Sequence, residues 1–558
     1  MGSILIDSRK KILPAVIFLF VSIFAFLSAL KAGERGFFAF DQSIVFDGGY
    51  RILSGQVPYK DFVIPLGPAA FWIQAAFFRL FGVSYSSYIF TSAVINTLAA
   101  ICGMLIIRML FPYHRLLSYA CGFITAAWFL PPFGTLWVDQ VSFFLSFLAI
   151  AALLFSCFYR AGSRAISSFS LAISGFLALF SILAKQNAGL YILPLYFILL
   201  LAARLPGLKT VLYNWFIFSC GFISGLLLFI VWLWVRSDVN IFLQYAVYIP
   251  SLLGVDRILQ AKEELFGIFS GVGSKYAQLY YLPASIIFIL ASSFIISVFT
   301  FIASIRGKGE RGLQDKKGLL ASILCLYVII FQYVFIHTTM NEAENSIPFI
   351  GIILAIAIAL LTRLYEPLRL KVKFAYPGIM PVTVISLLTV YLSIAGINVS
   401  LSRKVHGFSG AGFGESFTLD RLRGLRWALP TMAGEAAVKE SDITDLFNYL
   451  KAKNSNFFIF PNFTFFYGLL DAPSPQPLLW FHKGLTYHVI YDAALDKWIV
   501  DSLGKNEVRA IIIEDKPDYN HYMLNDFPAL KAYITDNFVK TKELGIFNIY
   551  EKTDPRLL

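Results

Sequence analysis

Charged residues are scarce in this sequence, and their scarcity excludes an ordinary soluble protein. Only 14% of the 558 residues are charged, whereas 58% are hydrophobic and 17% are aromatic. Soluble domains carry about 25% charged residues, so water is not the main solvent of this chain. Cysteine is also rare, and its five copies all lie within long apolar runs. This placement argues against a disulfide framework or a cysteine metal site in the polar parts of the chain.

Long apolar runs are what the chain has in abundance. A helix needs about 20 apolar residues to cross the hydrocarbon core of a bilayer. Runs of roughly this length without charge lie near 12–31, 86–107, 116–131, 141–159, 168–185, 188–203, 211–235, 282–305, 319–337, 347–362 and 379–397. The sequence therefore predicts a polytopic α-helical membrane protein of about 11 transmembrane helices, with the first run retained rather than cleaved as a signal peptide.

Basic residues are divided unevenly between alternate loops. The amino-terminal tail and every second loop together hold 18 Lys and Arg residues, whereas the short opposite loops hold one, Lys185. Lys and Arg accumulate on the cytoplasmic side, which predicts a cytoplasmic amino terminus and a carboxy-terminal region on the outer side of the membrane, periplasmic or extracellular. Much of the formal charge of +12 lies in these loops, where anionic lipid headgroups are its expected partners. Membrane lipids, and no nucleic acid, are the expected partners.

Two polar regions stand out from the helices. The first outer loop, 32–85, is too long for a simple connection and contains two helical patterns, 42–53 and 69–81, which we expect to lie in the membrane interface. Residues 398–558 alternate helical patterns with short apolar strands, as in a layered α/β domain. No GxGxxG or Walker-type loop supports nucleotide binding there. We thus expect a transmembrane domain, 1–397, that includes the first loop, and a soluble domain, 398–558.

The helices and strands expected in the soluble domain follow the same patterns. They are a helix at 441–453, a strand at 457–460, a helix at 489–503 and strands at 508–513 and 547–550. A further outer loop is expected at 236–281.

Polar groups with possible chemistry gather on the predicted outer side of the membrane. The apolar runs almost lack ionisable residues, whereas ion-coupled transporters need them near the midplane. A carboxylate beside a hydroxyl can act as a general base, and a lysine can neutralise a phosphate leaving group. These groups are suited to moving a sugar from a lipid-linked phosphate donor to a hydroxyl. They lie in the first loop, at 139–140, at 185–187 and at 337–344.

The segment 41–62, DQSIVFDGGYRILSGQVPYKDF, resembles the first outer loop of GT-C membrane glycosyltransferases. It is most similar to the protein mannosyltransferase, aminoarabinose transferase and RgtA-like groups. In these groups an acidic residue opens a juxtamembrane helix, and a Leu-x-Gly-x-x-Pro-Tyr-x-Asp-Phe segment follows. The matching residues are Leu53, Gly55, Pro58, Tyr59, Asp61 and Phe62. Asp139 and the 185–189 stretch extend the resemblance, but many relatives have Asp-Glu where this chain has Asp41-Gln42.

The resemblance implies an inverting transferase with a catalytic first loop. The donor would be a polyprenyl-phosphate sugar, and the acceptor a glycan, lipid or protein. Asp41 would act as the base on the acceptor, Asp139 would assist it or orient the acceptor, and Lys185 would face the donor phosphate. Further candidates for substrate binding are Gln186, Tyr59, Asp61, Arg51 and Asp47.

Each candidate residue also has a structural interpretation. Asp41 and Asp139 precede helical patterns and are possible helix N-caps. Asp61 is suited to fixing a turn, Lys185 to reaching the headgroups, and Asp47 is a second candidate for the catalytic acid. His337, Glu342 and Glu344 are weak metal candidates in a polar loop, so a divalent metal stays open and no other cofactor is expected.

Two other functions remain open from the sequence. A lipid-linked glycan transporter or flippase would need polar groups along an inner path. In a non-enzymatic scaffold, the acidic residues of the first loop would have no catalytic role.

Overall fold

The structure is a computed structural model. It describes residues 2–37, 39–130, 134–158, 164–204, 207–257, 259, 284–306, 313–339, 347–369, 379–402, 413–428, 438–514 and 524–553. The chain forms two compact units. The helical unit contains Met1–Ala32, Ser92–Leu227 and Gln260–Leu401, and the α/β unit contains Gly33–Thr91, Leu228–Leu259 and Ser402–Leu558. The first loop therefore groups with the carboxy-terminal residues, which differs from the expected division at 397/398.

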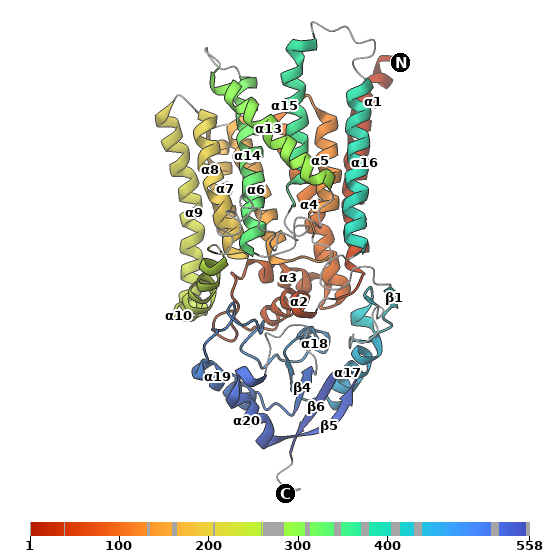
Figure 1. Cartoon of the computed structure of the whole chain (residues 1–558), viewed down its shortest axis with the longest axis vertical. Helices are drawn as coiled ribbons and strands as arrows, with labels where there is room; N and C mark the ends of the chain where they lie inside the picture. Colours follow the sequence, from red (N-terminus) through yellow and green to blue (C-terminus); the bar gives the residue numbers. More distant parts are fainter. Residues whose placement is uncertain are drawn as a thin grey trace, which may run out of the picture. The chain divides into compact units, whose positions relative to one another are not determined.

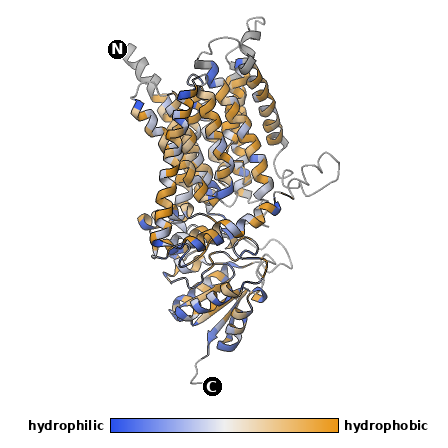
Figure 2. Cartoon of the chain, turned by 90° about the vertical axis from the view of Figure 1, so that its left-hand side faces the viewer, coloured by the Kyte–Doolittle hydropathy of each residue, from blue (hydrophilic) through white to orange (hydrophobic). Residues whose placement is uncertain are grey.

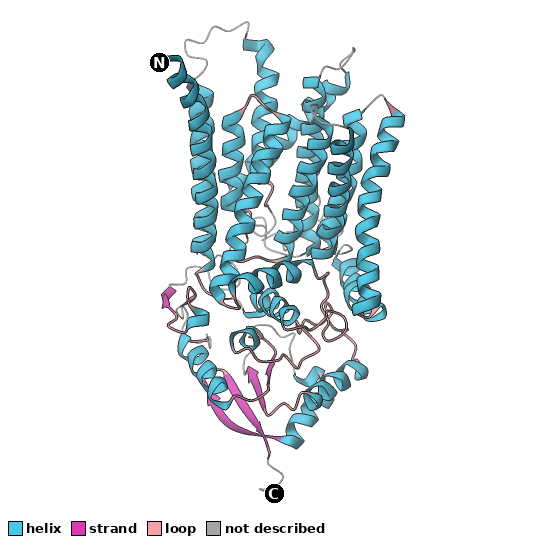
Figure 3. Cartoon of the chain, turned by 180° about the vertical axis from the view of Figure 1, so that it is seen from behind, coloured by secondary structure: helices cyan, strands magenta, loops and turns pink. Residues whose placement is uncertain are grey.

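Each predicted apolar run forms a helix (Figures 1 and 3). The helices are α1 (Gly2–Gly33), α4 (Tyr85–Leu110), α5 (Arg115–Trp128), α6 (Val138–Phe158), α7 (Arg164–Ala184), α8 (Gln186–Arg204), α9 (Leu208–Arg236), α13 (Ala284–Arg306), α14 (Leu313–Thr339), α15 (Ile350–Arg369) and α16 (Ile379–Ser402). The colouring in Figure 2 shows that these helices are predominantly hydrophobic. The chain is a polytopic helical membrane protein.

The set of candidate membrane spans differs in detail from the prediction. Among the described residues, 10 helices are long and apolar enough to cross a membrane. They include Val239–Arg257, which the sequence placed in an outer loop. Two predicted spans are not among them, α5, which has only 14 residues, and α15, whose apolar part Ile350–Arg363 is too short. The predicted orientation relies on an odd number of crossings, so it stays a prediction.

Buried polar side chains join neighbouring helices of the helical unit. The Asn96 side-chain amide of α4 donates to the carbonyl oxygens of Ala25 at 2.8 Å and Ala126 at 3.0 Å, which links α1, α4 and α5. The indole of Trp128 donates to the Leu392 carbonyl at 2.9 Å and links α5 to α16. Lipid is as apolar as the helix surfaces, so the hydrophobic effect does not drive these helices together. Interhelical hydrogen bonds of this kind contribute to their association instead.

The α/β unit contains a four-stranded mixed sheet with the strand order β3-β4-β6-β5. The strand bounds are β3 (Phe457–Phe460), β4 (Ala510–Glu514), β5 (Phe538–Leu544) and β6 (Phe547–Lys552). Strand β3 pairs in parallel with β4, and the other pairings are antiparallel. A two-stranded sheet, β1 (Phe413–Ser416) and β2 (Arg426–Ala428), is separate from it.

Short helices complete the α/β unit, as predicted for a layered α/β domain. They are α17 (Glu440–Lys453), α18 (Phe465–Leu469), α19 (Ala493–Lys505) and α20 (Pro528–Asn537). The buried carboxylate of Asp496 on α19 accepts the N–H groups of Ala529 at 2.7 Å and Leu530 at 3.0 Å. These bonds satisfy N–H groups at the start of α20, which have no backbone partner within that helix.

Candidate active site

The first loop contains both predicted helices, α2 (Ala39–Leu53) and α3 (Ala69–Phe81). They pack closely, because a side chain at Gly48 would place its Cβ 2.5 Å from the Phe71 ring. Helix α2 begins two residues before Asp41, so Asp41 lies in its first turn and the N-cap interpretation is wrong. The Asp41 side chain is half-buried, and the helix N-terminus favours its negative charge.

Asp47 and Arg51 form a buried ion pair one turn apart on α2. Their Oδ2 and Nε atoms are 2.9 Å apart, and both side chains are fully buried. Burial raises the pKa of Asp47 from 3.8 to about 6, although the Arg51 charge acts in the opposite direction. The guanidinium also lies over the Phe62 ring at 5.1 Å. These contacts favour a positioning role for both residues, and their direct contact with substrate stays a prediction.

A proline-rich segment, which we call the proline strap (residues 472–479), binds α2 and the chain that follows it. Prolines occupy every second position from 473 to 477 and have no N–H to donate. The intervening carbonyls of residues 472, 474 and 476 accept from the side chains of Tyr50 at 3.0 Å, Gln56 at 2.9 Å and Arg51 at 2.7 Å. Backbone bonds from Val63 to Pro477 and from Leu479 to Val63 continue this pairing.

A compact turn after α2 explains much of the sequence pattern from Leu53 to Phe62 that resembles the GT-C proteins. Gly55 has a φ of +96°, which favours glycine. The Tyr59 hydroxyl is buried and donates to the Leu66 carbonyl, and Asp61 accepts the Val57 N–H at 2.7 Å. The pKa of Tyr59 is raised well above its usual value by burial. Tyr59 and Asp61 thus stabilise the turn, and Asp61 stays exposed as a substrate candidate.

Asp139 and Lys185 are brought together within the helical unit. Asp139 lies in the first turn of α6, and Lys185 connects α7 to α8. The Lys185 Nζ and Asp139 Oδ1 atoms are 3.2 Å apart, with side-chain exposures of 18% and 1%. An ammonium group carries three donors, so this contact leaves Lys185 able to bind an anion as well.

Serine hydroxyl groups fix the helices that carry this pair. Ser181 of α7 lies 2.8 Å from the Ser142 hydroxyl and 2.9 Å from the Ser146 hydroxyl of α6. All three side chains are buried. These bonds hold α6 against α7 about one turn from Asp139 and Lys185. The packing of the two helices therefore sets the distance between Asp139 and Lys185.

The remaining predicted candidates are less well connected. Gln186 is the first residue of α8 and half-buried. His337 lies within α14, whereas Glu342 and Glu344 fall outside the described residues. Within the described ranges, no group of three or more His, Cys, Asp or Glu residues could hold a metal ion. The metal hypothesis, which includes Glu342 and Glu344, stays a prediction.

Sequence reasoning missed an aromatic cluster beside Asp41. The Phe40 ring lies 5.2 Å from the Trp480 ring and 5.8 Å from the His482 ring, and Trp480 and His482 are 4.9 Å apart. His482 is half-buried against these rings. The cluster joins residues about 440 positions apart, and nothing in the local sequence signals that contact.

Comparison with known proteins bears on the fold. No protein-family model and no curated protein matches the sequence. Among solved structures, the chain is similar to ArnT from Cupriavidus metallidurans in the apo state, with a TM-score of 0.50 and 12% identity over 96% of this chain and 97% of that one. The same protein bound to undecaprenyl phosphate matches with a TM-score of 0.50 and 13% identity over 97% and 98%. The chain has a GT-C fold.

The similarity to ArnT is not limited to the membrane helices. Similarity to ArnT extends over nearly the whole of both chains, so the helices, the first loop and the carboxy-terminal sheet are all parts of this GT-C architecture. Arabinofuranosyltransferase AftD from Mycobacteria matches at a TM-score of only 0.39 and 11% identity, over 98% of this chain and 40% of that one.

Proposed function

We propose that this GT-C protein is an inverting glycosyltransferase that moves a sugar from a polyprenyl-phosphate donor to an acceptor hydroxyl. The observation that carries the proposal is the half-buried Asp41 in the first turn of α2, within a chain that has the fold of ArnT. ArnT has been observed with bound undecaprenyl phosphate, which supports a lipid-linked donor here. The acceptor is a glycan, lipid or protein on the outer side of a bacterial inner membrane.

The proposed chemistry needs a base and a cation. Asp41 accepts the proton of the acceptor hydroxyl while that oxygen attacks the anomeric carbon from the face opposite the phosphate. The bond from the anomeric carbon to the phosphate oxygen breaks, and the polyprenyl phosphate leaves with its electron pair. The family resemblance assigns the cation to Lys185, which would neutralise the charge on the leaving phosphate, and Asp139 orients its ammonium through their 3.2 Å contact.

A direct test starts from the full-length protein and its bound lipids. Mass spectrometry of the purified protein is expected to identify a polyprenyl-phosphate species, and that lipid carrying a sugar is expected to support transfer in vesicles. Release of free polyprenyl phosphate should match sugar incorporation one to one. Movement of the intact lipid-linked sugar across the bilayer without such release would instead identify a transporter.

Lys185 gives a second test of the proposed function. Because an ionic hydrogen bond is worth about 1.5–3 kcal/mol, Lys185→Gln is expected to raise the KM for the lipid donor about tenfold or more. Lys185→Arg keeps the positive charge and should retain much of the affinity. The matched control is Lys209→Gln, at an exposed lysine of the same unit. Donor saturation curves that coincide for Lys185→Gln and Lys209→Gln would contradict phosphate binding by Lys185.

A further inference from the structure

Three consecutive apolar side chains are exposed in a loop of the α/β unit. Val489, Ile490 and Tyr491 have exposed fractions of 65%, 72% and 54%. The loop immediately precedes α19. Contiguous exposed apolar groups of this kind are uncommon on a surface that faces water, and they mark contacts with membranes or partners.

Local bonds hold this loop in a defined shape. The Ile490 N–H donates to Nδ1 of His488 at 3.0 Å, and the Tyr491 hydroxyl donates to Asp496 at 3.2 Å. Asp492 accepts the N–H groups of Ala494 and Leu495 and so caps α19. These polar groups already have partners, which lowers the cost of moving the loop into a less polar medium.

A second apolar surface of the same unit is continuous with a membrane helix. The last turn of α9 exposes Trp234, by 81%, and Val235. The Phe229 ring of α9 lies 5.3 Å from the Phe242 ring of α10 (Val239–Phe242). This ring contact packs α10 against the carboxy-terminal part of α9. Helix α10 is the first part of the apolar segment Val239–Arg257. The exposed side chains of this segment include Leu243, Val247, Tyr248, Leu252 and Val255.

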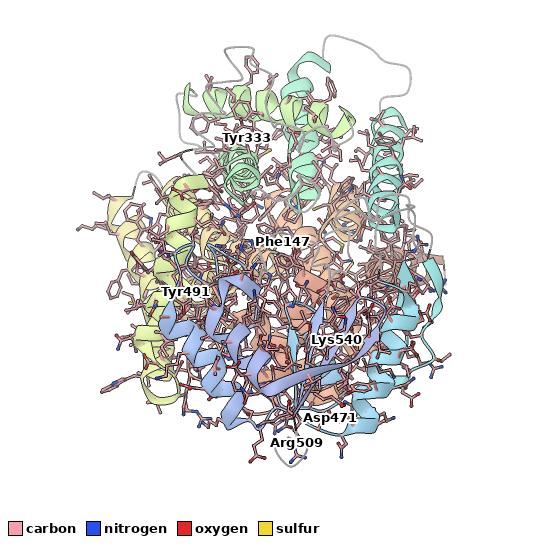
Figure 4. The ribbon with its side chains drawn as sticks, turned by 60° about the horizontal axis from the view of Figure 1, so that its bottom comes forward. Phe147, Tyr333, Asp471, Tyr491, Arg509 and Lys540 are labelled. Atoms are coloured by element: carbon pink, nitrogen blue, oxygen red, sulfur yellow. The ribbon has the colours of Figure 1, made fainter. Side chains whose placement is uncertain are left out.

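The exposed loop and this segment lie on the same side of the α/β unit. In Figure 1, α19, which directly follows the loop, and α10, with which the segment begins, both lie at the left of that unit. Figure 4, which is turned about the horizontal axis, shows Tyr491 at the same left-hand side and Lys540 of β5 farther to the right.

We propose that the 489–491 loop enters the headgroup region of the bilayer that α9 crosses. The occupant of this surface is lipid, because the loop lies on the same side of the α/β unit as the apolar surface at the end of a membrane helix. Tyrosine and tryptophan are enriched at the membrane interface, which fits Tyr491, Tyr248 and Trp234. The contact holds the α/β unit, including α2, at the lipid surface, and it does not depend on the proposed transferase activity.

Fluorescence quenching in vesicles tests this contact. The full-length protein is reconstituted in neutral and anionic phospholipid after Cys157→Ala and Cys220→Ala, since these two cysteines are not buried. An environment-sensitive fluorophore is attached to Ile490→Cys. The matched control is Val539→Cys on β5, an apolar side chain that is 55% exposed in the same unit.

Lipid contact predicts opposite behaviour of the two probes. Iodide in the aqueous phase should quench the probe at 490 about fivefold less than the probe at 539, and nitroxide-labelled lipid should quench only the probe at 490. Equal quenching by iodide at both positions would overturn the proposal. Protection from iodide without quenching by the labelled lipid would also overturn it, because a protein surface would then cover the loop.

Discussion

Replacing Asp41 with Asn is expected to lower kcat for sugar transfer by about 10²–10⁴-fold, the usual contribution of a general base. An amide has nearly the size of a carboxylate, but it cannot take a proton from the acceptor hydroxyl near neutral pH. The cost in stability should be small, because an acid in the first turn of a helix contributes about 0.3–1 kcal/mol. Initial rates in vesicles and the unfolding temperature of the purified protein measure the two effects separately.

A matched control separates loss of the base from loss of a helix charge. Glu440 lies in the first turn of α17 in the same unit, so Glu440→Gln makes the same chemical change without affecting the proposed base. We expect this variant to transfer sugar at close to the wild-type rate. Near-normal transfer by Asp41→Asn would remove the catalytic assignment, whereas loss of both transfer and folding would make Asp41 a structural residue.

The membrane helices were predictable because a single physical requirement controls them. Spanning hydrocarbon needs a long uncharged run with all backbone bonds made internally, and the runs near 12–31 or 379–397 meet that requirement in any context. The strand at Phe457–Phe460 was predictable for a similar reason, since all four of its side chains are buried. Strand β5 was not predicted, because its exposed central residues, with several charges, have the composition of a solvated segment.

The site was only partly predictable, because its bonds join distant positions through the backbone. Asp47 and Arg51 are separated by one helical turn, so their ion pair follows from α2 itself. The bond from Arg51 to the carbonyl of Gln476 spans 425 positions, and a carbonyl has no sequence signature. The start of α2 was misplaced because Ala39 and Phe40 belong to an apolar stretch without a clear N-cap residue.

Replacing Arg51 with Met is expected to destabilise the α/β unit by about 3–5 kcal/mol at neutral pH, because Asp47 loses the cation that offsets the cost of burying its carboxylate. The variant also loses the bond to the Gln476 carbonyl in the proline strap. The double variant Asp47→Asn/Arg51→Met removes both charges, so it should recover part of the lost stability. Unfolding temperatures of the single and double variants measure this difference, and an Arg51→Met protein as stable as wild type would contradict the importance of the pair.

The pH dependence of that loss identifies its cause. Burial raises the pKa of Asp47 from 3.8 to about 6, while Arg51 lowers it, so without Arg51 the pKa of the folded state should rise further. A raised pKa gives stability that is complete below the unfolded pKa and is lost as the pH rises through the folded pKa. The penalty of Arg51→Met should therefore be smallest near about pH 5 and grow toward about pH 8. The double variant has no carboxyl at position 47, so its stability relative to wild type should lack this steep growth, and a parallel pH profile for both variants would exclude Asp47 as the cause.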